Sequence, residues 1–440
     1  MNVACNSCAA LHWIDERIPQ PGDPQFEACC KHGDINLPLF QPPPEYLRGL
    51  LESTTTSARQ FRERLRSYNA ALAFTSVNCT VTNRGVARGG PNCFQIHGEL
   101  YHLQGPLEPP TNIAPRYAQL YFYDPSYATD IRLRARPDTQ LDATILRCLT
   151  AMLSEVRNPF IALYQTAKER LQAQPITTPS RIILNPQMRL ILEAGADRRR
   201  ENLPTSNEVA VIIPDEYGNA SFRDIVLADR CAPNEQPRYS RINSTHAAYM
   251  PLHYVLLFPR GDTGWHWGLQ LRDSNQARQR DRLSQRAYFR FYLHVRNDSK
   301  LVPFAYYRLF QQYIVDAWAL CDQNKLTWIR SNQTTLRAEL YNGVTDALTR
   351  ADLDPTLLGR RVVLPSSFLG GARFIGQCYQ DSMAIVRKYG RPSLFITFTA
   401  NPKWDEITRE LLPGQTATDR PDLIVRVFRI KVTHLLHDLK

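Results

Sequence analysis

The chain has 440 residues, of which 43% are hydrophobic and 22% are charged. This composition supplies apolar side chains for about two or three domains of roughly 100–200 residues each, and it excludes a chain that is disordered throughout. Basic residues number 53 against 42 acidic ones, a net charge of +11, and only eight of the basic residues are lysine. Because the planar arginine fork grips phosphate with two hydrogen bonds, this excess favours a polyanion such as nucleic acid, although codon usage in a GC-rich gene would also favour arginine.

No run of about 18 consecutive apolar residues occurs, so we expect no membrane-spanning helix. The first residues, Met1–Cys5, lack the basic start and the apolar stretch of a secretory signal. We therefore expect a protein of the nucleus or the cytoplasm that is not secreted. In these reducing compartments its ten cysteines are expected to be thiols or metal ligands rather than disulfides.

Residues 1–45 are rich in cysteine and end near a stiff run of three prolines, so we expect a small N-terminal zinc-binding segment. The spacing Cys5-x-x-Cys8 places two thiolates on one tight turn, at the separation that a tetrahedral Zn²⁺ requires. Cys29 and Cys30 follow about twenty residues later and close a loop that is too short for a core of its own. The pattern predicts one structural zinc ion per chain.

The fourth ligand of this zinc site is left open by the sequence. Adjacent Cys29 and Cys30 do not easily bind one ion together with ordinary geometry, which makes His32 and His12 rival candidates. The alternative is a cluster of buried or incidental thiols that binds no metal. The candidate ligands are Cys5, Cys8, Cys29, Cys30 and His32.

Residues 46–270 mix strand-like and helix-like runs, and we expect one α+β or barrel-like domain here that binds DNA. Runs rich in β-branched and aromatic residues predict strands, and a 3.6-residue apolar spacing predicts helices. The expected strands cover 71–77, 94–101, 117–123, 209–213 and 222–227, the expected helices cover 59–68, 141–156 and 160–172, and an aromatic loop covers 251–268.

From residue 271 to residue 440 the pattern changes to long helices, which completes a multi-domain α+β fold. Proline at the first turn with an acid beside it opens the last helix at residue 421, and its apolar periodicity still runs at Lys440. The other expected helices cover 276–296, 304–330, 334–350 and 377–389, with a turn-rich link over 364–371 and a strand over 394–399.

Four arginines spaced four residues apart form the clearest candidate for contact with nucleic acid. This spacing aligns guanidinium groups on one face of the expected helix, where they would bind phosphate. Aromatic residues alternate with them and could stack on unpaired bases, but a core position fits an amphipathic helix better. The arginines are Arg278, Arg282, Arg286 and Arg290, and the aromatics are Tyr288, Phe289, Phe291 and Tyr292.

Several catalytic motifs are missing from the sequence. Without a Gly-Lys dipeptide there is no P-loop, so we expect no ATP-driven unwinding by these residues. The sequence also lacks the metal-binding patterns HExxH and His-x-His and the serine nucleophile pattern GxSxG. From the residues alone we expect a zinc-bearing, basic, multi-domain protein that binds nucleic acid, with no catalytic residues.

Further stretches of the chain resemble the N-terminal half of the Helitron rolling-circle transposon proteins, a replicase-helicase family. The likeness covers nearly the whole chain, and its helicase-like portion corresponds to about 285–440. The similar stretches are Arg66–Ser76, Leu309–Ala317, Leu364–Phe368, Tyr379–Ile385 and Leu394–Trp404, together with the opening Cys5-x-x-Cys8, Leu11–Trp13 and Cys29–Cys30.

The resemblance implies a protein that nicks and transfers single-stranded DNA with a Rep-type nuclease and unwinds it with a fused helicase. Of three nuclease motifs, only the first strand is present; its scaffold residues are Phe395, Thr397, Thr399 and Asn401. The histidine pair that binds Mg²⁺ or Mn²⁺, the attacking tyrosines and the ATP-dependent helicase would follow Lys440, so we expect a chain cut before them. We therefore expect an N-terminal part that binds single-stranded DNA and is inactive alone, or alternatively a repurposed module that binds nucleic acid or protein.

Overall fold

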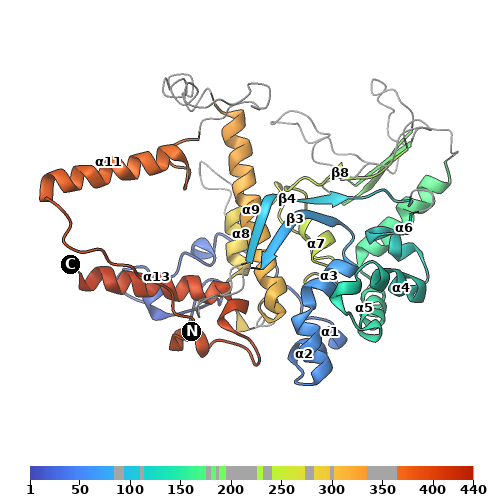
Figure 1. Ribbon diagram of the computed structural model, residues 1–440, viewed down its shortest axis with the longest axis horizontal. Coiled ribbons are helices and arrows are strands. Elements are labelled where there is room, and N and C mark those ends of the chain that lie inside the picture. Colours follow the sequence, from blue (N-terminus) through green and yellow to red (C-terminus); the bar gives the residue numbers. More distant parts are fainter. Residues whose placement is uncertain are drawn as a thin grey trace. The chain divides into compact units, whose positions relative to one another are not determined.

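The computed structural model describes residues 1–83, 94–109, 113–174, 180–184, 188–194, 225–230, 240–272, 282–297, 302–333 and 364–439 (Figure 1). These residues mix helices with short strands, and helices predominate. They divide into two compact units, Met1–Ala317 with Asn401–Lys440 and Trp318–Ala400, and each is described by itself. Among the described helices, none has both the length and the apolar composition needed to span a bilayer.

The N-terminal segment contains only short elements. Strands β1 (Val3–Ala4) and β2 (Leu11–His12) pair antiparallel, and they are followed by the 3-10 turns η1 (Ile14–Glu16) and η2 (Lys31–Gly33). A segment this small cannot bury an apolar core of its own. It must therefore pack on other parts of the chain.

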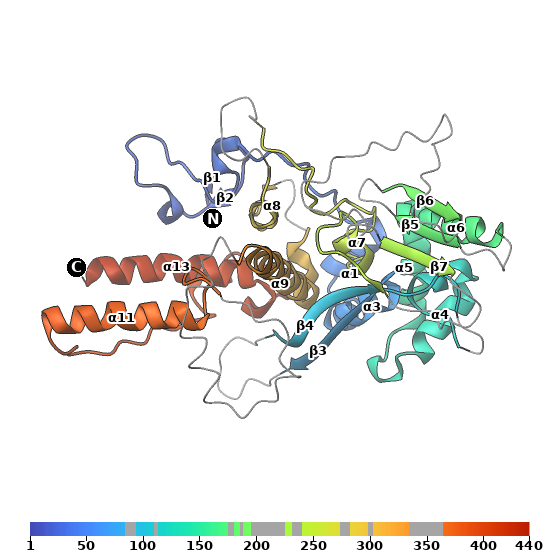
Figure 2. The ribbon, with the colours of Figure 1, turned by 90° about the horizontal axis from the view of Figure 1, so that it is seen from above.

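One partner of this segment is the stretch of chain that follows α8 (Gln285–Tyr292). Ala10 forms an antiparallel bridge with Arg296, and the Leu11 N–H donates to the Val295 carbonyl at 2.8 Å. The small β1–β2 ribbon therefore lies beside the end of α8 (Figure 2).

The helices follow the sequence expectations closely where local signals are strong. Asp142 caps α5 by accepting hydrogen bonds from the Thr144 and Ile145 N–H groups, and Asn158 caps α6 ahead of a proline. The expected helix 59–68 is instead two helices, because the chain leaves helical geometry at Arg64. The helices are α1 (Glu45–Glu52), α2 (Thr56–Glu63), α3 (Leu65–Leu72), α4 (Pro125–Arg134), α5 (Ala143–Glu155), α6 (Pro159–Gln172), α7 (Tyr249–His253), α8, α9 (Tyr307–Ser331), α11 (Ala372–Tyr389), α12 (Asp405–Thr408) and α13 (Pro421–Asp438).

The remaining strands form two antiparallel three-stranded sheets with the orders β3-β4-β8 and β6-β5-β7. Both are open, so the described residues give the barrel alternative no support. The strands are β3 (Ser76–Asn83), β4 (Phe94–Gln104), β5 (Ser180–Leu184), β6 (Leu190–Ala194), β7 (Ile225–Arg230) and β8 (Ser240–Arg241).

Three expected strands differ from the structure. Residues 117–122 form the 3-10 turn η3, whose Tyr121 stacks on Phe74 with ring centroids 4.6 Å apart. The run 71–77 begins as the end of α3 and becomes a strand only at Ser76. Residues 394–399 have no regular secondary structure, because no described strand pairs with them and a strand needs a neighbour for its hydrogen bonds. The expected strand 209–213 and helix 334–350 lie outside the described residues.

The core of the larger unit is aromatic and lies among α3, α6 and the 3-10 turn η3 (Tyr117–Phe122). Phe74 stacks on Tyr164 at 5.3 Å and packs against Phe160 at 5.9 Å. The fully buried Asn69 side chain joins this core to the 253–256 loop, since it donates to the His253 carbonyl and accepts from the Leu256 N–H.

A second buried group connects β4 to α9. His102 Nε2 lies 2.7 Å from Asp316 Oδ2, and the Tyr254 hydroxyl donates to the same oxygen at 2.9 Å. His102 Nδ1 lies 3.1 Å from the Tyr249 carbonyl. Because a carbonyl oxygen only accepts hydrogen bonds, Nδ1 is the donor in this contact. Because His102 and Asp316 are no more than 1% exposed, they form a polar contact inside the core.

Candidate metal centre and nucleic-acid interface

Four cysteine sulfurs converge in the N-terminal segment. The Sγ atoms of Cys5, Cys8, Cys29 and Cys30 all lie within 4.8 Å of one another. The Sγ–Sγ distance is 3.8 Å for Cys5–Cys30 and 3.8 Å for Cys29–Cys30. Four sulfurs placed tetrahedrally at about 2.3 Å from a zinc ion are about 3.8 Å apart, so this arrangement fits Zn²⁺.

The backbone explains how the two pairs meet. In the first pair, the Cys5 N–H donates to the Ala10 carbonyl and the Ala9 N–H donates to the Cys5 carbonyl, both at 2.8 Å, which closes the CxxC turn. Gly33 packs against this turn with φ +96°, and a Cβ at that position would lie 3.4 Å from the Ser7 Cβ. Glycine is favoured there by the left-handed backbone, because the space beside Ser7 would admit a Cβ at ordinary contact distance.

Adjacent Cys29 and Cys30 were not expected to bind one ion together easily, but the backbone places both sulfurs in the same cluster. After Cys30, the chain runs through positive φ at Lys31, His32 and Gly33, and the Gly33 and Ile35 N–H groups both donate to the Cys30 carbonyl. This sharp reversal lets the Cys29 and Cys30 side chains face the same centre. The fourth ligand offered is therefore a cysteine, and the exposed His32 lies outside the cluster.

The four thiols also alter one another's acidity. Hydrogen bonds from the Cys29 and Cys30 thiols lower the pKa of Cys8 to about 6 and lower that of Cys5 as well. The neighbouring Cys30, Cys5 and Cys8 sulfurs raise the pKa of Cys29. A divalent cation at the centre would let all four sulfurs carry negative charge, which the bare cluster disfavours.

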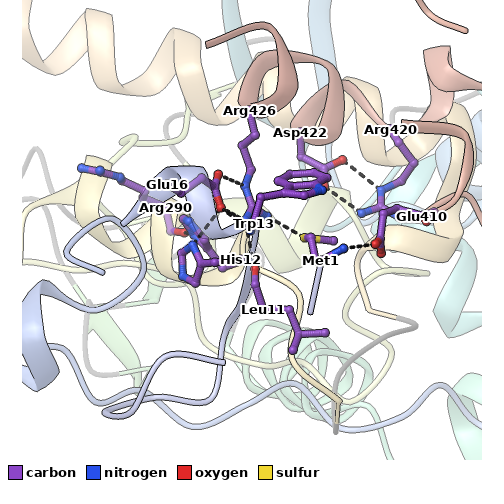
Figure 3. Close-up of polar contacts among 11 residues, drawn as sticks. Met1, Leu11, His12, Trp13, Glu16, Arg290, Glu410, Arg420, Asp422 and Arg426 are labelled. Atoms are coloured by element: carbon purple, nitrogen blue, oxygen red, sulfur yellow. Dashed lines mark hydrogen bonds and ion pairs between the residues drawn. The ribbon is translucent and has the colours of Figure 1, made fainter. Parts of the chain in front are cut away.

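His12, the rival ligand, has a different role. Its ring stacks on Phe26 at 4.1 Å, and its Nδ1 lies 2.9 Å from Glu16 Oε2. The Arg426 guanidinium from α13 donates to both oxygens of this carboxylate, at 2.7 and 2.6 Å (Figure 3). Burial would raise the pKa of Glu16, but the hydrogen bonds from Arg426 and His12 hold it at about 2.

More contacts fasten the N-terminus to α13 and the segment before it. Arg426 also donates to the Leu11 carbonyl at 2.9 Å and lies 4.9 Å from the centre of the Trp13 ring. The N-terminal ammonium of Met1 pairs with Glu410 (Figure 3). Met1 and Trp13 also pack on a small buried cluster. The members of that cluster are Ile407, Ala417, Leu423 and Val427. No local spacing in the sequence could reveal these contacts, because the partners lie about 400 residues apart.

The predicted arginine face is only partly present. Arg286 and Arg290 are exposed and lie one turn apart on α8. Arg282 is exposed but lies before the helix, where its backbone forms an antiparallel bridge with Gln270. Arg278 lies outside the described residues. The four-arginine face is therefore reduced to two arginines on the described helix.

The aromatic residues of α8 belong to the core, as the helical pattern favoured. Tyr288, Phe289, Phe291 and Tyr292 are all at most 7% exposed. Tyr292 stacks on Phe40 with centroids 4.0 Å apart and donates its hydroxyl to the Pro38 carbonyl. These four rings are therefore not available to stack on bases.

The predicted nuclease scaffold lies on the surface. Phe395 is 96% exposed, and Thr397, Thr399 and Asn401 are exposed as well. No described strand pairs with them, so their role as a scaffold strand stays a prediction.

Comparison with known proteins concerns the C-terminal part of the chain. Residues 288–440, roughly a third of the sequence, match the family model of the Helitron helicase-like domain at the N-terminus. A search of curated proteins gives no match. The matched part includes Arg290 and most of α8, and it contains α9, α11 and α13. Residues 288–440 are therefore similar to the Helitron helicase-like domain, and the N-terminal cysteine segment packs on α13 and on the stretch after α8, which both lie in the matched part.

Proposed function

We propose that this chain is the DNA-engaging N-terminal part of a Helitron-type rolling-circle transposition protein that acts in the nucleus and binds single-stranded DNA. The family match over 288–440 supports this assignment, and the net charge of +11 supports a polyanionic partner. We also propose that Cys5, Cys8, Cys29 and Cys30 hold one structural Zn²⁺, because their sulfurs fit its tetrahedral geometry.

The observation that carries the DNA proposal is a group of exposed arginines from two helices. Arg286 and Arg290 lie on α8, and Arg429 lies on α13. Partial desolvation lowers the pKa of Arg290, the nearby positive charges of Arg286 and Arg429 lower it further, and the Glu27 carboxylate opposes this shift. A phosphate bound beside these guanidinium groups would relieve their mutual repulsion and accept their hydrogen bonds.

The preference for single strands follows from the Helitron resemblance and not from base stacking by α8, whose aromatic rings are buried. We propose contact mainly with the sugar-phosphate backbone, with little dependence on base sequence. We propose no catalytic role for any described residue, so the chain alone should bind DNA without cleaving it.

The decisive experiment measures binding of a labelled single-stranded oligonucleotide by fluorescence anisotropy over a range of salt concentrations. The double variant Arg286→Ala/Arg290→Ala should bind about tenfold more weakly, and the slope of log affinity against log salt should fall by about 1.4, since each phosphate contact on a single strand contributes about 0.7. The control Arg48→Ala/Arg59→Ala removes two exposed arginines from α1 and α2 and therefore the same charge.

Equal weakening in the control would attribute binding to net charge and remove the assignment to α8. Absence of salt-dependent binding in the unaltered chain would overturn the DNA proposal itself. A covalent protein–DNA adduct after incubation with Mn²⁺ and single-stranded DNA would contradict the assignment as a binder without catalysis.

The zinc proposal is tested separately on the full chain. After removal of metal and reconstitution, we expect one Zn²⁺ per chain by elemental analysis. Cys5→Ser/Cys29→Ser should lose the ion, whereas His32→Ala should keep it, because His32 lies outside the sulfur cluster. A chain that takes up no zinc, or that loses zinc only in the histidine variant, would contradict this site.

A further inference from the structure

Arg296 is a buried arginine in the region similar to the Helitron helicase-like domain, and it touches the cysteine cluster. It is 3% exposed and lies four residues after α8. Its Nε donates to the Cys8 carbonyl at 3.0 Å, and its Nη2 lies 3.4 Å from the Cys8 Sγ. The Phe291 and His294 carbonyls accept hydrogen bonds from Nη1 at 2.8 and 3.1 Å.

The charge of this side chain has no carboxylate partner among the described residues. Its hydrogen bonds go to three backbone carbonyls and one sulfur, and it forms no ion pair with a described Asp or Glu. A buried guanidinium without a counter-charge is strongly disfavoured, because the protein interior solvates a charge poorly. The Cys8 sulfur is the contact that can supply negative charge.

We propose that Arg296 is the counter-charge of the metal centre and that it donates a charge-assisted N–H···S hydrogen bond to the Cys8 thiolate. This inference rests on the zinc part of the proposed function. Four thiolates around Zn²⁺ leave the centre negatively charged, and a guanidinium at the Cys8 sulfur offsets part of that charge. Arg296 is therefore a positioning residue that acts on the metal through Cys8.

The surroundings of Arg296 favour arginine over lysine. The Phe291 ring lies 3.9 Å from the guanidinium carbon and supports the flat face of the group. The guanidinium uses all three of its nitrogens, in one rigid plane, to reach the Cys8 carbonyl, the Cys8 sulfur and two further carbonyls. A lysine ammonium has a single nitrogen and cannot make this set of contacts.

With Arg296, the metal centre contains residues from two separate parts of the chain. The ligands belong to residues 5–30, whereas the counter-charge belongs to the matched region 288–440. Ala10 bridges to the Arg296 backbone, so the same residue pairs with the segment by strand contact and by charge. The electronic state of the thiolates should consequently report whether the segment is docked on the domain.

The test replaces zinc with Co²⁺ in the full chain and compares Arg296→Met with the unaltered protein. Loss of the hydrogen bond and of the positive charge raises the energy of the sulfur lone pairs, so the sulfur-to-cobalt charge-transfer band should shift to longer wavelength. Transfer of Zn²⁺ to a competing chelator should become about tenfold faster, as for other outer-sphere partners of metal ligands. Arg296→Lys keeps the charge and should recover part of both effects.

The matched control is Arg272→Met. Arg272 is an exposed arginine that lines the same pocket of about 170 Å³ as Cys8 and Arg296. This control should leave the band and the transfer rate unchanged. Circular dichroism establishes folding. If Arg296→Met does not fold, Arg296→Gln removes the charge but keeps N–H donors, and it should shift the band and the transfer rate in the same direction by a smaller amount.

An unshifted band and an unchanged transfer rate in a folded, cobalt-loaded Arg296 variant would overturn the counter-charge proposal and leave the zinc site standing. An unaltered chain that binds neither Co²⁺ nor Zn²⁺ would overturn both.

Discussion

Residues 1–40 and the aromatic core around Phe74 belong to the same compact unit but are held together by different interactions. The N-terminal segment relies on four thiols, on the Glu16–Arg426 pair and on a small apolar cluster beneath Met1 and Trp13. The core relies on stacked aromatic rings and on buried polar contacts such as His102–Asp316. Among the described residues, the first region alone brings together side chains that could hold an added ion.

The difference follows from the number of apolar residues available to each region. A segment of about 40 residues buries too little apolar surface to fold alone, and metals or ion pairs commonly replace the missing core. The helices α3 to α6 contain enough buried aromatic and aliphatic side chains to pack without a metal. Loss of the proposed zinc ion should therefore affect the two regions very differently.

The largest effect is expected from removal of the proposed zinc ion. Structural zinc contributes on the order of 10 kcal/mol to the folding of small zinc-binding peptides, so Cys5→Ser/Cys29→Ser should unfold residues 1–40. Hydrogen exchange should show lost protection there and weaker protection in α13, while α5 and α6 keep theirs. The exposed Cys378→Ser serves as control. Equal loss of protection in α5 and α6 would show that both regions depend on the metal.

The next effect concerns the core. Asp316→Ala leaves His102 buried without its carboxylate, and breaking a buried pair of this kind costs about 3–5 kcal/mol. Chemical denaturation should show this loss with or without chelator, because the residue does not touch the N-terminal segment. Asp322→Ala on the same helix is half-buried and should change stability by less than about 0.5 kcal/mol. A loss at Asp316 that appears only in the metal-loaded chain would remove the distinction between the regions.

The smallest effect concerns the link between the N-terminal segment and α13. Glu16→Gln removes the charge that pairs with Arg426 and should cost about 1–3 kcal/mol at neutral pH. The folded pKa of Glu16, about 2, lies below the unfolded value of about 4.3, so its stabilisation is present above the unfolded pKa and is lost as the pH falls toward 2. The stability difference between the two proteins should shrink below about pH 4.

The control for this measurement is Glu63→Gln, since Glu63 is exposed at the end of α2. Its stability difference from the unaltered chain should be near zero at every pH. A Glu16→Gln difference that persists unchanged at low pH would show that the carboxylate charge is not its source.

Local signals predicted the helices well and the strands poorly. The caps Asp142 and Asn158 and the apolar spacing after them act within a few residues, so α5 and α6 begin and end close to the expected positions. The runs 117–123 and 394–399 have strand-like composition, but a strand forms only beside a partner. In the first run, Tyr121 packs on Phe74 instead; in the second, Phe395 is exposed.

At the candidate metal site, too, local spacing predicted part of the geometry and tertiary packing decided the rest. The CxxC spacing and the pair Cys29–Cys30 identified the four sulfurs, because a tight turn and a short loop set their separation. The sequence does not reveal the left-handed turn after Cys30, which brings both adjacent sulfurs to one centre, and it therefore leaves His32 as a rival ligand. Single-residue backbone geometry of this kind depends on what packs against the turn, here Ser7 against Gly33.

The sequence by itself determined the basic character, the four clustered cysteines, the main helices and the resemblance that the family match over 288–440 confirms. Only the tertiary structure decided which charges meet. Glu16 and Arg426 lie 410 positions apart, and Cys8 and Arg296 lie 288 positions apart. Spacing along the chain predicts contacts within one helix or one turn, whereas these pairs exist because separate elements pack on the same N-terminal segment.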